Sequence, residues 1–321
     1  MDGCSIKFVS LPKEKFHKFM NTRFDPTGTG VALATPFKKD FSIDYDALGR
    51  LVDFLIERKV EYIVVLATTG EAVTMTWEER SHVARFVAEH AAGRIPLVLG
   101  MSSNATVFLA QQLRTIDLTG YSAVLSVVPF YNKPSQRGIL AHFSAVAEAS
   151  PLPVILYNVP SRTGANMEAA TTLELARKYP GKVIAVKEAS GRIGQIREII
   201  EKKPAGFRVL SGDDALTLPL IAMGAEGVIS VIANALPDRF STMVRLAMAG
   251  RFDQAGAIDR PLQPLYRYLF TDGNPSGIKA LLSILGLAEN VLRLPLVPVT
   301  DPTFEALMAA SAAVPDSFNA K

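Results

Sequence analysis

The sequence predicts a (β/α)8 barrel, also called a TIM barrel, with a helical appendage at its carboxyl end. Eight short apolar segments rich in Val, Ile and Leu recur along the chain, and stretches with helical spacing of apolar residues separate them. The apolar segments do not alternate with polar residues, which indicates strands covered on both faces, as in a parallel sheet. Eight strand and helix units in about 220 residues match the size of this fold.

The predicted strands are bounded by Gly, Pro or Ser. In chain order they are GTGVALAT (28–35), YIVVLATT (62–69), IPLVLGMS (95–102), AVLSVVPF (123–130), VILYNV (154–159), VIAVKEAS (183–190), FRVLSGD (207–213) and GVISVIAN (227–234). In the helical stretch after the first strand, Leu48, Leu51 and Leu55 share one face, which would cover the sheet. An open doubly wound sheet is the rival architecture. It would place a Gly-rich turn after its first strand, whereas the glycines of GTGVALA precede the apolar run.

Three regions follow from this pattern. Residues 28–250 form the catalytic barrel, and the helices-only pattern beyond predicts a carboxyl-terminal helical region over 251–321. The basic segment 1–27 lacks strand-like runs and is expected to lie outside the barrel. Met20 lies shortly before the first strand, and one hypothesis is that translation starts there.

Composition favours small molecules as partners and a soluble protein in the cytoplasm. The chain has 321 residues, 49% of them hydrophobic, and 34 Lys and Arg against 31 Asp and Glu without charge blocks. This charge balance does not indicate a basic surface that would bind nucleic acid or an acidic membrane. One cysteine excludes an internal disulfide, and neither a signal peptide nor an apolar run of membrane length is visible.

A lysine ends one of the predicted strands. In a (β/α)8 barrel the chemistry takes place at the carboxyl ends of the strands, and Lys187 ends the apolar run VIAVK. Burial disfavours the charged ammonium, so the neutral amine becomes available to form an imine with a carbonyl substrate. The structural alternatives are an ion pair with Glu188 or a side chain that extends its ammonium out of the barrel. Adjacent strand residues point to opposite faces, which argues against the ion pair.

Other polar residues follow the neighbouring strands. Tyr131 and Tyr157 are either core aromatics or a relay that moves protons to and from a substrate. Arg162 in SRTG either forms an ion pair within its loop or binds a substrate carboxylate through its planar guanidinium. The sequence TTGE (68–71) predicts a loop whose hydroxyls and N–H groups bind a second carboxylate.

Neither a metal nor a cofactor is predicted. All four histidines fall in the amino-terminal tail or in helical stretches, away from the strand ends. Asp213 and Asp214 form a single carboxylate pair, which is more typical of a turn or a helix cap than of a cation site. No nucleotide-binding fingerprint occurs either.

From about Gly28 to the last helix, the chain resembles the 4-hydroxy-tetrahydrodipicolinate synthase family, formerly called dihydrodipicolinate synthases, of the class I aldolase superfamily. The resemblance rests on TTGE (68–71), PFYNKPSQRG (129–138), YNVPSRTG (157–164), VKEASG (186–191), SGDD (211–214) and GVISV (227–231), in family order and spacing. It implies condensation of pyruvate with L-aspartate 4-semialdehyde in diaminopimelate and lysine biosynthesis. It also implies a homotetramer built from two tight dimers.

The resemblance also implies residue roles. Lys187 would form the Schiff base, with Tyr157 as proton relay and Thr68 linking it to Tyr131, which would reach into the neighbouring subunit's site. The other implied roles concern substrate binding. Thr68 and Thr69 would bind the pyruvate carboxylate, and Arg162 would bind the carboxylate of the aldehyde. Gly212 and Ile229 would line the pyruvate site. The SRTG sequence favours the synthases over the sialic acid lyases and sugar-acid aldolases of the superfamily, although a sugar-acid aldolase remains the alternative function. A catalytically silent barrel would be expected to lack the lysine or the tyrosines.

The sequence departs from the family pattern at two places. Ala67 stands where the family usually has glycine before TTGE. The positions matching the lysine feedback site of inhibited bacterial members are Ala72, Trp77, Arg80, Asn104, Phe108 and Phe130. Aromatic residues there replace a histidine, a glutamate and a tyrosine, so an ammonium ligand loses its anionic partner. Weak or absent inhibition by L-lysine is therefore expected.

Overall fold

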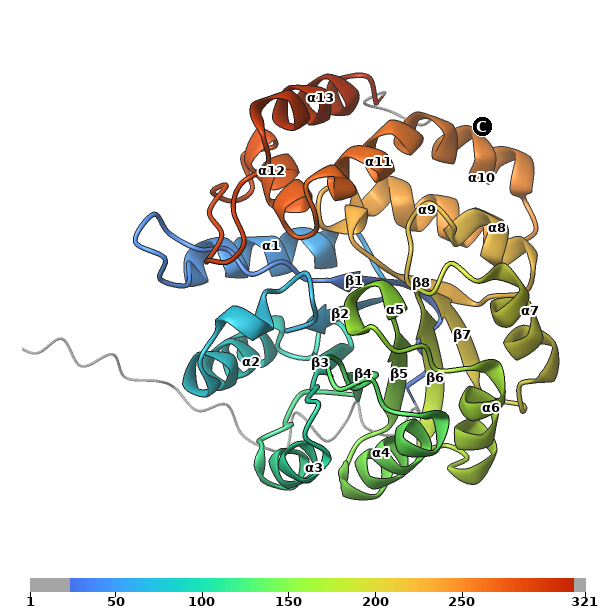
Figure 1. Ribbon diagram of the computed structural model, residues 1–321. Coiled ribbons are helices and arrows are strands. Elements are labelled where there is room, and N and C mark those ends of the chain that lie inside the picture. Colours follow the sequence, from blue (N-terminus) through green and yellow to red (C-terminus); the bar gives the residue numbers. More distant parts are fainter. Residues whose placement is uncertain (1–23, 315–321) are drawn as a thin grey trace, which may run out of the picture.

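Eight parallel strands close into a barrel in the computed structural model, which describes residues 24–314 (Figure 1). Each strand pairs with the next, and β8 returns to β1. The strands are β1 (Gly28–Ala32), β2 (Tyr62–Val65), β3 (Leu97–Gly100), β4 (Ala123–Val127), β5 (Val154–Asn158), β6 (Val183–Glu188), β7 (Arg208–Ser211) and β8 (Gly227–Ser230). Each lies within one of the eight predicted segments, so the predicted fold class is confirmed.

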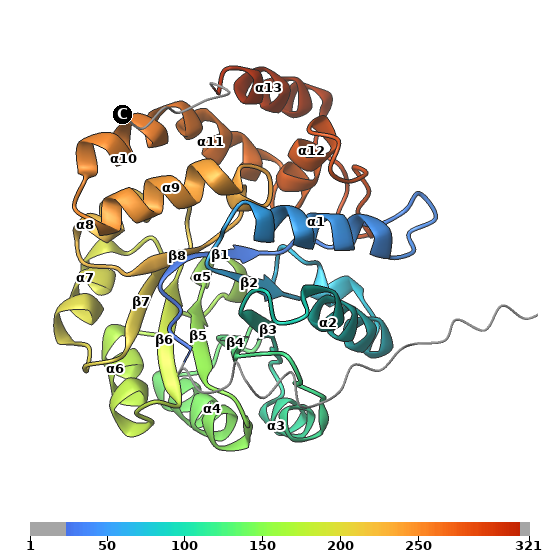
Figure 2. The ribbon, with the colours of Figure 1, turned by 180° about the vertical axis from the view of Figure 1, so that it is seen from behind.

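A ring of helices surrounds the strands, as both views show (Figures 1 and 2). Following β1 to β8 in turn, they are α1 (Tyr45–Glu57), α2 (Trp77–Ala91), α3 (Thr106–Thr115), α4 (Gln136–Ala149), α6 (Ala169–Lys178), α7 (Ile193–Lys202), α8 (Thr217–Ala222) and α9 (Pro237–Met248). A short α5 (Pro160–Thr163) lies between β5 and α6. Within residues 24–314, the 3₁₀ helices are η3 (Ala72–Thr74), η4 (Ile232–Asn234) and η5 (Arg260–Leu262).

Local signals explain where two of these helices begin. Asp44 caps α1, because its carboxylate accepts a hydrogen bond from the backbone N–H of Ala47 at 3.0 Å. Thr76 and Glu79 form a capping box at α2, in which each side chain accepts from the other residue's backbone N–H. The buried residues of α1 include Leu48, Leu51 and Leu55, the predicted sheet-facing set.

The carboxyl-terminal helices gather at one edge of the barrel. They are α10 (Phe252–Asp259), α11 (Gln263–Thr271), α12 (Ser276–Ile284) and α13 (Asp301–Ala312). In both views they lie beside α9 and α1, on the side away from α3 and α4 (Figures 1 and 2). The predicted boundary at residues 250 and 251 falls between α9 and α10, and the division into separate regions stays a prediction. Met20 and most of the predicted tail lie outside the described residues.

The barrel has an outer core beneath the helices and an inner core between the strands. At the amino ends of the strands the fully buried Tyr62 fills the interior, and Phe24 packs edge-on against its ring at 5.6 Å. Gly30 permits this filling, because a Cβ atom there would lie 2.1 Å from the Tyr62 ring. The interior is thus closed at that end, and the polar residues lie at the other.

Candidate active site

Lys187 and Tyr157 lie side by side inside the barrel. They are register partners on β6 and β5, and Lys187 Nζ lies 4.3 Å from the centre of the Tyr157 ring. Both side chains are buried, with exposed fractions of 4% and 6%. Among residues 24–314, Lys187 Nζ has no hydrogen-bond acceptor and no carboxylate partner. An amine held between strands without a counter-charge is suited to attack a carbonyl carbon.

Glu188 points to the opposite face and does not pair with Lys187. Its carboxylate accepts hydrogen bonds from Asn158 Nδ2 at 2.7 Å, from Gln195 Nε2 at 3.1 Å and from the Ser190 hydroxyl at 2.5 Å. Burial raises the pKa of Glu188, while these hydrogen bonds oppose the shift. The alternative of a Lys187–Glu188 ion pair is thereby excluded.

Gly212 and Ile229 complete the wall beside the lysine. A Cβ atom at residue 212 would lie 3.1 Å from Lys187 Cε and 2.7 Å from Ala189 Cβ, so only glycine leaves this space open. Ile229 is fully buried on β8 and belongs to the same inner core as Tyr157. Ala67, the departure from the family pattern, is buried in that inner core as well.

The TTGE loop, residues 68–71, follows β2 at the same end of the barrel. Thr69 is buried, and its hydroxyl accepts a hydrogen bond from Asn274 Nδ2 at 3.0 Å. Thr68 is half-buried, and its carbonyl accepts from the backbone N–H of Glu71 at 3.1 Å, which closes a tight turn. The turn therefore places Thr68 and Thr69 just beyond the carboxyl end of β2.

Arg162 lies on α5 above the strand ends. Proline at the first helical position and Gly164, with φ of +71°, bound this single turn. The exposed guanidinium donates to the backbone carbonyl of Asn274 at 3.1 Å and forms no ion pair with a described carboxylate. Arg162 therefore retains donors for an anionic ligand. Asn274 contacts both Thr69 and Arg162, and thus joins two predicted binding residues.

Tyr131 follows β4, and its side chain projects into solvent. Its side chain is 88% exposed, and its backbone adopts a positive φ of +74°, which is unusual for a residue with a Cβ atom. Its N–H donates to the Thr163 carbonyl at 3.2 Å, which fixes the backbone beside α5. Within the described chain no hydrogen bond joins the hydroxyls of Thr68, Tyr157 and Tyr131, so the proton relay stays a prediction.

Two residues near the site were not predicted from the sequence: Asn274 and Lys279, just before and within α12. Lys279 forms a fully buried ion pair with Glu71 of the TTGE loop. The sequence signal for Lys279 is the one that identified Lys187, a single lysine within the apolar stretch GIKALLSIL. Asn274 has no comparable signal, because asparagine before proline is ordinary in a loop.

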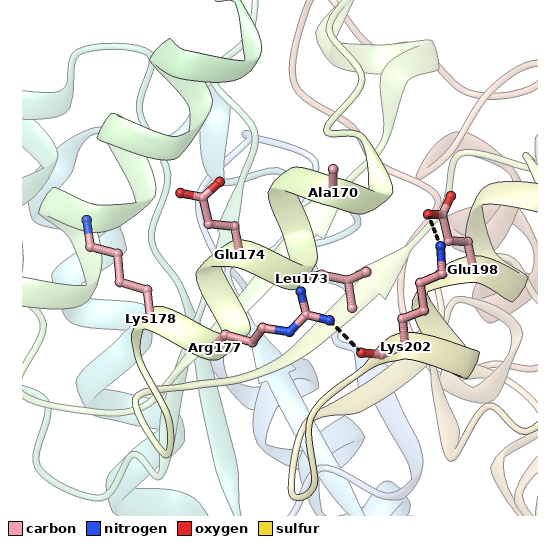
Figure 3. A pocket seen from close by; sticks show the side chains of 7 residues that line it. All are labelled: Ala170, Leu173, Glu174, Arg177, Lys178, Glu198 and Lys202. Carbon is pink, nitrogen blue, oxygen red and sulfur yellow. Dashed lines mark hydrogen bonds and ion pairs between the residues drawn. The ribbon is translucent and has the colours of Figure 1, made fainter.

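A wide surface groove lies away from this site. It has a volume of about 650 Å³ and is lined from α6 and α7 by Ala170, Leu173, Glu174, Arg177, Lys178, Glu198 and Lys202 (Figure 3). Lys202 is paired there with Glu198, and the Lys202 carbonyl accepts from Arg177. The groove shares no residue with the strand-end site.

Within residues 24–314, no group of three or more His, Cys, Asp and Glu side chains is arranged to hold a metal ion. None of the helices in this range is long and apolar enough to cross a membrane.

The model of the dihydrodipicolinate synthetase family matches residues 25–313. The chain belongs to this family. It is 55% identical over 282 residues to the 4-hydroxy-tetrahydrodipicolinate synthase of Phocaeicola vulgatus, covering 88% of this chain and 95% of that protein. As a member of a family whose named enzymes are lyases, the chain is an enzyme of that class.

Two solved structures are similar to this chain over most of its length. A chloride-inhibited dihydrodipicolinate synthase from Acinetobacter baumannii, complexed with pyruvate, is 36% identical with a TM-score of 0.86, covering 90% of this chain and 98% of that one. A dihydrodipicolinate synthase from Cyanidioschyzon merolae with lysine bound is 38% identical with a TM-score of 0.86, covering 90% and 98%. The family's architecture therefore extends over the described chain.

Proposed function

We propose that the chain condenses pyruvate with L-aspartate 4-semialdehyde to give 4-hydroxy-tetrahydrodipicolinate, in diaminopimelate and lysine biosynthesis. The observation that carries the proposal is the buried Lys187 amine without a counter-charge, 4.3 Å from the Tyr157 ring centre. The relative from Acinetobacter baumannii, which was crystallised with pyruvate, supports the first substrate.

The chemistry proceeds through covalent attachment at Lys187. The neutral amine attacks the carbonyl carbon of pyruvate, and the carbonyl oxygen leaves as water to give an imine. Loss of a methyl proton yields an enamine, whose carbon forms the new bond to the aldehyde carbon of the second substrate. The amine of that substrate then displaces Lys187 from the imine carbon, which closes the ring and frees the enzyme.

The surrounding residues take distinct parts in this scheme. Tyr157 carries the protons to and from the adduct, through Thr68 and Tyr131. Thr68 and Thr69 bind the pyruvate carboxylate, while Gly212 and Ile229 shape the space beside the lysine. Arg162 binds the carboxylate of aspartate semialdehyde, and its lack of a described carboxylate partner supports this role.

A second subunit completes the site in this proposal. Tyr131 is 88% exposed although a relay needs it buried, so it reaches into the site of a tightly bound partner copy. The exposed Val73, Val107 and Phe108 follow β2 and β3 in the chain, and an interface would cover these apolar side chains as well. Two such dimers would form the homotetramer.

Inhibition by L-lysine is proposed to be weak or absent. Trp77 and Arg80 line a small cavity of about 20 Å³, and no carboxylate lines it. Phe108 and Phe130 likewise offer no negative charge to the two ammonium groups of the amino acid. Without an anionic partner, such a ligand loses more in desolvation than it gains.

Reductive trapping tests the function directly. The native chain is incubated with pyruvate, reduced with borohydride and digested, and the reduced pyruvyl adduct is expected on Lys187, with none in Lys187→Arg. An adduct on another lysine would overturn the mechanism. An adduct on Lys187 with turnover of a sugar acid, and none of aspartate semialdehyde, would favour the alternative aldolase.

A further inference from the structure

The segment at the start of α12 holds the TTGE loop at two points. The Asn274 amide donates to the Thr69 hydroxyl at 3.0 Å, and the Lys279 ammonium forms an ion pair with the Glu71 carboxylate. The two anchored residues are two positions apart and lie on either side of Gly70. The helical region beyond the barrel therefore fixes the loop that is proposed to bind the pyruvate carboxylate.

The Glu71–Lys279 pair is fully enclosed by protein. The side chains have exposed fractions of 0% and 1%. Lys279 Nζ also donates to the Val291 carbonyl at 2.8 Å and lies 4.0 Å from the centre of the Phe37 ring. The Glu71 carboxylate also accepts from the backbone N–H of Arg293 at 3.3 Å. Burying two charges costs desolvation that their attraction only partly returns, so stability alone is a poor reason for the pair.

The loop conformation needs support from outside. Glu71 has φ of +53° and ψ of 32°, a left-handed backbone that residues with a Cβ atom seldom adopt. Beside it, the Gly70 carbonyl accepts from the Thr35 hydroxyl at 2.8 Å, and a Cβ atom at residue 70 would lie 2.9 Å from the Leu33 carbonyl oxygen. The side chains that hold this turn therefore determine where Thr69 points.

We propose that the Glu71–Lys279 ion pair positions the TTGE loop for binding of the substrate carboxylate. Both are positioning residues, because they act through Thr69 and are separated from the reacting atoms. The inference rests on the proposed function, since the carboxylate in question belongs to pyruvate. Through Lys279, α12 would then help to determine how the active site binds pyruvate. A purely structural pair would influence unfolding and leave pyruvate binding unchanged.

The test compares two lysine and glutamate pairs at opposite ends of the barrel. The double variant Glu71→Gln/Lys279→Met removes both buried charges, which avoids leaving one of them unpaired. The control is Lys203→Met/Glu226→Gln, which removes a partly buried pair with 2.5 Å between Nζ and Oε1. Lys203 precedes β7 and Glu226 precedes β8, at the amino ends of the strands. For each variant, thermal unfolding and borohydride trapping are measured over a series of pyruvate concentrations.

We expect the pyruvate concentration for half-maximal adduct on Lys187 to rise at least about tenfold in the Glu71 and Lys279 double variant. The maximal yield of adduct should stay the same, because the lysine itself is untouched. The control double variant should label like the native chain at every concentration, even where its unfolding temperature falls. Labelling of the first variant with the native pyruvate dependence would overturn the inference.

Two further outcomes remain informative. If this double variant fails to fold, Glu71→Gln/Lys279→Gln also removes both buried charges and keeps a donor at residue 279 for the Val291 carbonyl. It should still show the shift in pyruvate dependence, and a native dependence would refute the positioning role. If the native chain itself forms no adduct on Lys187, the proposed function fails, and the inference fails with it.

Discussion

Gly212 leaves open space beside the Lys187 side chain, because a Cβ atom at residue 212 would lie 3.1 Å from Lys187 Cε. Gly212→Ala adds this atom where the carbons of the proposed imine would fit. Overfilling of this kind costs about 1–3 kcal/mol, so adduct formation should fall by about fivefold to about 150-fold. The measurement is the initial rate of borohydride trapping with pyruvate.

Gly194→Ala is the matched control for Gly212→Ala. Residue 194 is also a glycine, and a Cβ atom there would meet nothing within 4 Å. This variant should trap pyruvate at the native rate. A native rate in Gly212→Ala itself would contradict the placement of the substrate beside residue 212.

The Tyr157 hydroxyl is expected to carry protons, whereas its ring packs against Lys187. Tyr157→Phe keeps the ring and removes the hydroxyl, so kcat for condensation should fall by about a hundredfold or more. The fold should survive, which circular dichroism checks. Tyr62→Phe removes another buried hydroxyl, 3.4 Å from the Val228 carbonyl at the closed end of the barrel, and should leave kcat unchanged. Equal effects of the two variants would argue against a relay through Tyr157.

The sequence was sufficient to predict the barrel and the position of Lys187, because both depend on local patterns. Continuous apolar runs give the strands, and a lysine at the end of such a run must face the mouth or the helices. The contact of Asn274 with Thr69 joins residues 205 positions apart, and no local pattern encodes such a pair. The partner of Lys279 was unpredictable for the same reason, although the lone lysine in an apolar helix was visible.

Tyr131 provides a test of the proposed tight dimer by subunit mixing. Tyr131→Ala and Lys187→Ala should each be nearly inactive as pure proteins. In a mixed dimer, the subunit that retains Lys187 receives Tyr131 from its partner, so one site of two is complete. Random mixing should therefore restore about a quarter of the native activity. If mixing restores no activity while mass spectrometry shows mixed dimers, Tyr131 does not act across the interface.

Sensitivity to lysine should depend on charge at residue 108. The native chain is expected to keep full activity at about 1 mM L-lysine, because Phe108 and the cavity beside Trp77 offer no carboxylate. Phe108→Glu adds a carboxylate at a half-exposed position near the start of α3, so inhibition by L-lysine should increase. Strong inhibition of the native chain below 1 mM in a steady-state assay with saturating pyruvate would contradict the expectation.

His142 should make the fold sensitive to mild acid. It is buried on α4, with its Nδ1 atom 2.8 Å from the Thr106 hydroxyl, and burial lowers its pKa from 6.5 to about 4. In the unfolded chain the ring takes up a proton near pH 6.5, whereas the folded chain resists protonation until about pH 4. The stability from the neutral ring is therefore complete above pH 6.5 and is lost as the pH falls toward 4.

This difference corresponds to about 2 kcal/mol of unfolding free energy lost between pH 7.5 and pH 5. His142→Gln removes the titrating ring while keeping a polar group for Thr106. Between pH 7.5 and pH 5, the unfolding free energy of the variant should therefore fall by about 2 kcal/mol less than that of the native chain. Urea unfolding at the two pH values measures the difference, and His82→Gln, at an exposed histidine on α2, should retain the native loss. An identical loss in the native chain and His142→Gln would show that other groups cause the acid sensitivity.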